Sequence, residues 1–200
     1  MIEALIGLLG VVVGALMTAA KDIWVDRRSR RKDAEYLAIR VVSMLDRFIE
    51  GCAEVAGDDG LSDEQLDEDG ERQIQVSEPK FEVQSLDVEW KSISARLMYD
   101  ILSFPELITA ANHRVSGAFE HDCPPDYEEG FEERQFQYTA LGLKASKLSN
   151  ELRSNYSLPK RDYKDWDPIE YLSEQQNRIK ENRARKNERR AKMWEPGQAQ

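Results

Sequence analysis

The strongest constraint on this chain is an uncharged apolar run close to its N-terminus. Residues 4–20 read ALIGLLGVVVGALMTAA and contain no acidic or basic side chain. A helix of that length spans about 25 Å, and a bilayer core of about 30 Å is crossed by about 17–25 residues. Lys21 can extend its ammonium group towards the membrane surface, and Trp24 is typical of the interface. We therefore predict a transmembrane anchor over residues 1–25.

Two other interpretations of this run are weaker. A secretory signal peptide begins with basic residues, whereas this N-terminus offers only Glu3, and Thr18 with Ala20 makes a poor cleavage site. A helix buried inside a soluble domain would need apolar partners on every side, and a chain of 200 residues has little core to supply them. The pattern favours a single span.

The orientation of the span follows from the basic residues after it. Five of them lie close to its C-terminal end: Arg27, Arg28, Arg30, Arg31 and Lys32. Because such residues resist translocation, we predict an outer N-terminus and a cytoplasmic domain over residues 21–200, at the inner or plasma membrane. A reducing compartment agrees with Cys52 and Cys123, which are too few for a disulfide framework.

One face of the apolar run is built from small residues, namely Gly7, Gly10, Gly14 and Thr18. Small residues let two helices approach closely in lipid, where association depends on packing. This face predicts a helix–helix interface between copies of the chain, hence a homo-oligomer. The alternative is that glycine is simply frequent in transmembrane helices.

Charge is strongly segregated along the chain. The net charge is -10, residues 41–133 alone carry 24 acidic and 6 basic side chains, and residues 176–192 carry 8 basic and 2 acidic ones. An overall basic surface for nucleic acid is excluded, and no nucleic-acid partner is expected. The basic tail could contact anionic lipid, dock on the acidic middle or remain a solvated helix. The candidate lipid contacts are Lys21, Trp24, Arg27, Arg28, Arg30, Arg31, Lys32, Arg183, Arg185, Lys186, Arg189 and Arg190.

The rest of the chain reads as helices separated by short breaks. Leu37, Val41, Met44, Phe48, Cys52 and Val55 recur at helical spacing, so residues 26–57 should continue the anchor as a stalk helix. Residues 58–84 should form an acidic linker, extended at 74–84, where a small β-hairpin is the alternative.

A helical bundle domain is predicted over residues 85–158. Trp90, Ile93, Leu97 and Ile101 mark one helix face, and 103–121 with 127–157 should form an α-hairpin capped at Ser103 and Asp126. Residues 159–200 should form a basic C-terminal helix and tail, which begins at Asp167-Pro168 with a Trp166–Tyr171 staple and has no apolar face after Ile179. The fold class is all-α, with a single transmembrane helix that continues into a cytosolic bundle.

Signatures of catalysis are absent from the sequence. There is no phosphate-binding glycine loop, no G-x-S-x-G and no H-E-x-x-H. The only local metal candidate is His121-Asp122-Cys123, which is more typical of a polar helix end. Four acidic residues, Glu128, Glu129, Glu132 and Glu133, suit the positive end of a helix dipole. We predict no catalytic residues, no cofactor and no metal.

These features favour a non-enzymatic function at the lipid bilayer. The expectation is a membrane-tethered scaffold or protein-interaction module that self-associates and recruits a protein partner. The alternative is a membrane-acting effector, a permeabiliser of the phage or defence type, whose transmembrane helices oligomerise into a lesion.

Overall fold

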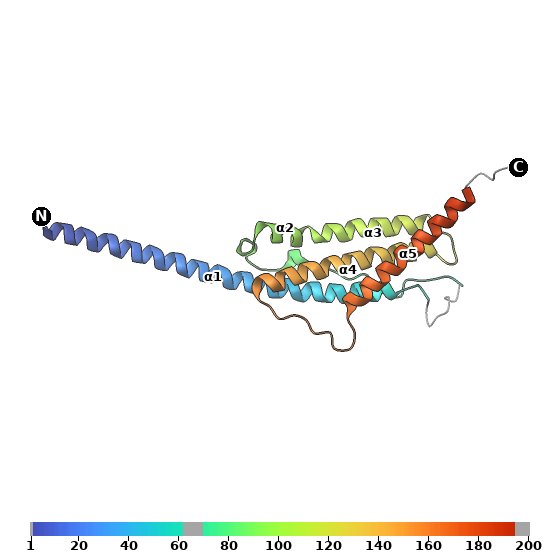
Figure 1. The fold of residues 1–200 in the computed structure, drawn as a ribbon, viewed down its shortest axis with the longest axis horizontal. Coiled ribbons are helices and arrows are strands. Elements are labelled where there is room, and N and C mark those ends of the chain that lie inside the picture. Colours follow the sequence, from blue (N-terminus) through green and yellow to red (C-terminus); the bar gives the residue numbers. More distant parts are fainter. Residues whose placement is uncertain (1, 62–69, 195–200) are drawn as a thin grey trace.

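The computed structural model describes residues 2–61 and 70–194, and the side chains at 2–13, 15, 16, 19, 20 and 194 are not described. The elements are α1 (Ile2–Gly57), the 3-10 turns η1 (Val83–Ser85) and η2 (Trp90–Ser92), α2 (Ala95–Leu102), α3 (Phe104–Glu120), α4 (Glu128–Tyr156) and α5 (Pro168–Trp194). Every regular element in these residues is helical, which confirms the all-α prediction (Figure 1).

The bundle is organised around the second half of α1. This helix has no proline and, between Gly14 and Gly51, no glycine, and it ends at Gly57 as predicted. Its first half projects away from the other helices, while residues 34–56 contribute one face to the core (Figure 1). The hydrophobic core therefore extends across the boundary that we predicted between a stalk helix and a bundle domain. Of the predicted stripe, Met44 is only partly buried, and Leu45 beside it is fully buried.

The α-hairpin is formed by α3 and α4, but its helix starts differ from the prediction. Ser103 has helical backbone angles (φ -83°, ψ -10°) because α2 runs almost directly into α3, and its side chain caps nothing. A capping residue needs an extended backbone, so the capping box fails here. Residue Tyr127, not Asp126, occupies the cap position of α4. The carboxylate of Asp122 accepts a hydrogen bond (2.8 Å) from the N–H of Gly130 instead.

An extended segment returns from the end of α1 along the bundle. Residues 71–82 contain no helix or strand, so the alternative hairpin at 74–84 does not form, and the 3-10 turn η1 replaces the last part of the stretch predicted to be extended. The part of the acidic linker at 62–69 lies outside the described residues. Phe81 anchors the segment by edge-to-face contacts with Phe48 and Phe104, at centroid distances of 6.0 and 5.3 Å.

The start of α5 agrees with the prediction. The N–H of Ile169 donates to the carboxylate of Asp167 (2.8 Å), and the rings of Trp166 and Tyr171 pack at 5.8 Å. Leu172 is fully buried where α1, α4 and α5 meet at Gly142. A Cβ atom at Gly142 would lie only 2.7 Å from the Leu172 side chain and 2.9 Å from that of Cys52, so the close approach of these helices needs a glycine.

Candidate interaction surfaces

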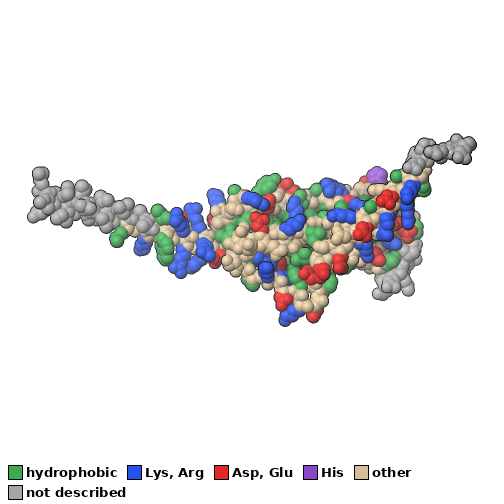
Figure 2. Space-filling view, viewed as in Figure 1, with side chains coloured by type: hydrophobic (Ala, Val, Ile, Leu, Met, Phe, Trp, Pro, Cys, Tyr) green, Lys and Arg blue, Asp and Glu red, His purple; other side chains and the backbone are tan. Residues whose placement is uncertain are grey.

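The first candidate surface is the bare part of α1 next to the apolar run. Every side chain from Lys21 to Asp33 is exposed, including Trp24 at 61%. The guanidinium of Arg28 lies 5.3 Å from the Trp24 ring, and Arg30 pairs with Asp26 at 3.0 Å. Figure 2 shows the lysine and arginine side chains gathered on this stretch of helix. The predicted lipid contacts at 21–32 thus lie together on one open segment.

Across the described part of the chain, no helix combines the length and apolar composition that crossing a bilayer requires. The burial of most residues in the apolar run at 4–20 is not described, and Gly7 and Gly10 are among them. At Gly14 an added Cβ would meet nothing within 4 Å. The hydroxyl of Thr18 donates to the Gly14 carbonyl at 2.9 Å. Both residues are exposed, so this part of the small-residue face is uncovered.

The second candidate surface is a charged contact between α4 and α5. The face of α5 that packs on the bundle begins with Leu172 and Ile179, which are buried and two helical turns apart. It continues with a basic row, Arg183, Lys186 and Arg190, at steps of four, three and four residues, and this row is progressively more exposed. The two helices run antiparallel, so this basic row meets the acidic residues at the start of α4. The pairs are Arg183–Glu132 (2.9 Å), Arg183–Glu133 (2.7 Å), Lys186–Glu128 (3.0 Å), Lys186–Glu132 (2.9 Å) and Arg190–Glu129 (3.1 Å).

This contact corrects two interpretations made from the sequence. The end of α5 does have a face to bury, but the face is charged, and a search restricted to apolar periodicity overlooks it. The four glutamates are not only helix-dipole residues, because each is paired with the tail. The sequence contained a signal for this contact, because Arg183, Lys186 and Arg190 continue the helical spacing of Leu172 and Ile179 on the same face.

The first and least exposed cation of the row is Arg183. Its guanidinium lies between Glu132 and Glu133 and 4.4 Å from the ring centroid of Phe136. The hydrogen bond that Lys186 donates to Glu132 raises the pKa of this lysine above its ordinary 10.5. A raised lysine pKa stabilises the docked state below pH 10.5, and this contribution disappears as the pH rises through the folded-state value. Lys186 is therefore charged at neutral pH, and its ion pairs with Glu128 and Glu132 contribute to docking there.

The position of this row bears on its predicted lipid contact. Residue Arg134, next to Glu133, pairs with Asp58 just beyond the end of α1, so the row lies at the end of the bundle opposite the N-terminus (Figure 1). At about 1.5 Å per residue, residues 21–57 span about 55 Å. Surface fields are screened within about 10 Å at ordinary salt. For an upright α1, docking on α4 is thus the contact available to the tail, and Arg185 and Arg189 face solvent there.

We expect the four glutamates at the start of α4 to keep the basic tail from binding membranes. A chain that begins at Asp33 should ignore vesicles of acidic lipid, whereas Glu→Gln at 128, 129, 132 and 133 should release the tail and create binding. Three freed cations at about 1 kcal/mol each give an increase of about 100-fold. The measurement is vesicle co-sedimentation. Glu→Gln at 54, 151, 170 and 174 removes the same charge and should have no effect; equal binding by both variants would refute the docking interpretation.

The third feature, which sequence reasoning missed, is a buried ion pair that joins α1 to α4. Asp58 and Arg134 lie 2.8 Å apart, with both side chains 1% exposed. The Asp58 carboxylate also accepts hydrogen bonds (3.0 Å each) from the N–H groups of Gly60, Gln75 and Val76. The guanidinium of Arg134 donates to the Val76 carbonyl as well. One carboxylate thus fixes the end of α1, the return segment and α4.

The residues of the metal candidate at 121–123 make local contacts at the end of α3 and the start of α4. Within residues 2–61 and 70–194, no group of three or more His, Cys, Asp or Glu side chains could hold a metal. The ring of His121 is bonded to the Gly117 carbonyl (2.8 Å), and Asp122 is engaged at the start of α4. Burial raises the pKa of the Cys52 thiol well above its ordinary value, which leaves it protonated at neutral pH.

Comparisons with protein-family models, curated proteins and solved structures find no match to this chain. Its function is therefore argued from its own residues and their geometry.

Proposed function

We propose that this protein is a membrane-tethered scaffold that self-associates through its N-terminal helix and presents a helical bundle on the cytoplasmic side. In this proposal residues 4–20 span the bilayer, the N-terminus lies outside and residues 21–200 lie in the cytoplasm. The recruited partner is a protein that binds the bundle. No catalytic residue is assigned.

The observation that carries the proposal is the continuity of α1. One helix leads from the apolar run through the basic segment into the bundle core, without a proline and with no glycine between Gly14 and Gly51. The exposed residues 21–33 would hold the bundle about 20 Å from the end of the apolar run. The five basic residues at 27–32 would lie beside anionic headgroups, where each adds about 1 kcal/mol to the attachment. Such a helix supports a rigid spacer between membrane and bundle.

Self-association is supported by the small-residue face of the apolar run. Gly14 leaves open space on the helix surface, and Thr18 satisfies its hydroxyl on the same helix instead of needing an external partner. Both features permit a second helix to approach closely, which is how packing drives association in lipid.

The test uses the full chain in membranes. Gly10→Ile together with Gly14→Ile should reduce self-association at least tenfold in a membrane two-hybrid assay, because the added side chains separate the helix backbones. Val12→Ile, on another face of the same helix, is the matched control and should leave the signal unchanged. An unaltered signal in the glycine variant would remove the proposed interface, and recovery of the protein in the soluble fraction would remove the membrane tether.

The same experiment separates the scaffold from a permeabilising effector. A scaffold dimer leaves the membrane potential intact when the chain is overproduced. Collapse of the potential that depends on Gly10 and Gly14 would assign the effector function instead.

A further inference from the structure

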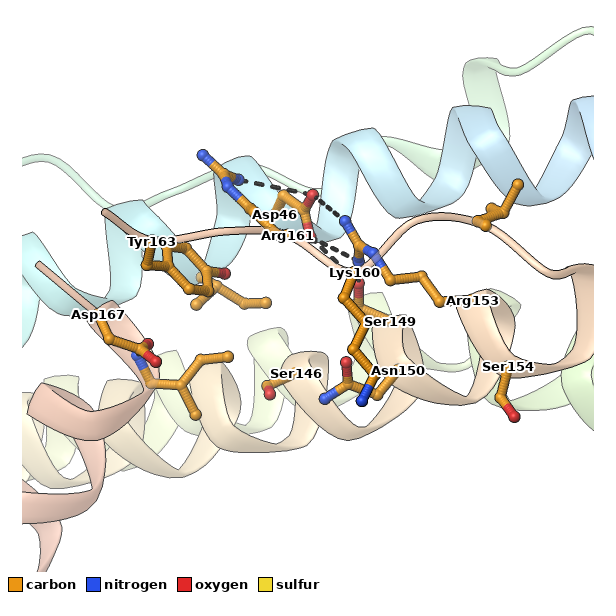
Figure 3. A pocket seen from close by; sticks show the side chains of 13 residues that line it. Asp46, Ser146, Ser149, Asn150, Arg153, Ser154, Lys160, Arg161, Tyr163 and Asp167 are labelled. Atoms are coloured by element: carbon orange, nitrogen blue, oxygen red, sulfur yellow. Dashed lines mark hydrogen bonds and ion pairs between the residues drawn. The ribbon is translucent and has the colours of Figure 1, made fainter. Parts of the chain in front are cut away.

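A pocket lies beneath the connection between α4 and α5. We call residues 157–167 the strap. It runs past α1 and α4 and borders a cleft of about 440 Å³ that is open to solvent on one side, within the range of about 300–1,000 Å³ typical of small-molecule sites. Figure 3 shows its polar side chains arriving from α1, α4 and the strap. Neither the proposed scaffold function nor the charged contact between α4 and α5 involves this cavity.

The acidic residue at the centre of the pocket wall is already neutralised. Asp46 receives Arg153 at 2.7 Å and Arg161 at 3.5 Å, and the hydroxyl of Ser149 donates to it at 3.1 Å. Arg161 also pairs with Glu50. The two guanidinium groups and the two carboxylates therefore balance, and they hold the strap against α1.

The second acidic residue of the lining is also engaged. Asp167 accepts the N–H of Ile169 at 2.8 Å at the N-terminus of α5, where the helix dipole favours a carboxylate. A cation entering the pocket would thus find no free acidic residue with which to pair.

The polar groups left over can all donate hydrogen bonds, and one of them is positively charged. Lys160 extends from the strap into the pocket towards Asn150 of α4 (Figure 3). Lys160 and Asn150 are exposed to solvent, whereas Ser146 is buried. In the described part of the chain, no carboxylate lies within ion-pair distance of Lys160, and neither the Asn150 amide nor the Ser146 hydroxyl makes a hydrogen bond within the protein. Burial raises the pKa of Tyr163, so its hydroxyl also keeps its proton.

We infer that this pocket binds a small anionic molecule whose oxyanion, a phosphoryl or carboxylate group, is held by Lys160, Asn150 and Ser146. A single ammonium without a counter-ion and two neutral donors match the charge and the lone pairs of such a group. Ile49, Leu158 and Ile169 supply apolar walls for the remainder of the molecule. A bare ion would leave most of the 440 Å³ unfilled, so the natural ligand is an organic molecule with one anionic end.

The test uses the full chain in nonionic detergent, with inorganic phosphate and succinate as separate probes at constant ionic strength. Acetylation of lysines is quantified by peptide mass spectrometry. Binding should slow the labelling of Lys160 at least fivefold in a saturable manner. Lys164, which lies exposed on the same strap outside the pocket lining, is an internal control and should be labelled at an unchanged rate. The more effective probe identifies the phosphoryl or the carboxylate class.

Variants complete the test. Each probe that binds should raise the melting midpoint of the full chain in a saturable manner. Lys160→Ala should increase the probe concentration needed for half of this rise at least tenfold, and Lys164→Ala should change that concentration less than twofold. If Lys160→Ala lowers the melting midpoint without a probe, Asn150→Ala replaces it as the reporting variant. Absence of saturable protection with both probes, or equal effects at Lys160 and Lys164, would overturn the assignment.

Discussion

Replacing Arg134 with methionine is expected to lower the free energy of unfolding by about 3–5 kcal/mol, because both members of the Asp58–Arg134 ion pair are buried. The methionine fills much of the volume but leaves the Asp58 carboxylate buried without its counter-ion. Whole domains are stable by only about 5–15 kcal/mol, so the variant should unfold at a much lower urea concentration. The measurement is urea unfolding followed by circular dichroism, in a chain that begins at Asp33.

Arg96→Met is the matched control for this prediction. Arg96 makes an exposed pair with Asp100 at 3.7 Å, and such pairs contribute at most about 1 kcal/mol. Similar losses for Arg96→Met and Arg134→Met would contradict the buried position of the Asp58–Arg134 pair.

The second large effect is expected at the aromatic cluster under the return segment. Phe104 is 1% exposed and packs edge-to-face on Phe48 and Phe81, at 5.4 and 5.3 Å. Phe104→Ala should cost about 3–5 kcal/mol, because the cavity adds to the lost transfer free energy. It should also release Phe81 and with it the extended segment.

Limited proteolysis together with urea unfolding measures both consequences. Cleavage within residues 71–82 should accelerate in Phe104→Ala. Tyr99→Ala, which removes an aromatic ring that is 71% exposed on α2, should change stability by about 0.5 kcal/mol or less. An unchanged cleavage rate in Phe104→Ala would show that the segment is held by other contacts.

Much of the helical fold could be predicted because its signals are local. The periodicity around Leu148 and Leu152, both buried, marked α4, and Asp167-Pro168 marked the start of α5. Each of these signals lies within a few turns of helix, where spacing alone decides which side chains share a face.

The contacts that hold the ends of the bundle together could not be predicted in this way. Asp58 and Arg134 are separated by 76 residues, and the sequence places Asp58 in a run that resembles a solvated acidic linker. Likewise, the strap pocket depends on Asp46 meeting Arg153, 107 residues away. Only the packing of α1 against α4 brings these charges together and removes them from water. The basic row of α5 is a different case. The spacing of its residues could be recognised in the sequence, but the glutamates of α4 with which it pairs could not.

The continuity of α1 also fixes how the bundle is rotated about the helix axis relative to the apolar run. An α-helix turns by about 100° per residue, so the direction in which the bundle faces is set by the direction in which the apolar run faces. Two copies joined along Gly10 and Gly14 would therefore present their bundles at one fixed mutual angle. Because every side chain from Lys21 to Asp33 is exposed, inserting one alanine there should rotate each bundle by about 100° and leave its packing intact. In such a dimer the exposed segment would act as a torsional coupling, in which a twist at one end of the helix reappears as a reorientation of the surface at the other.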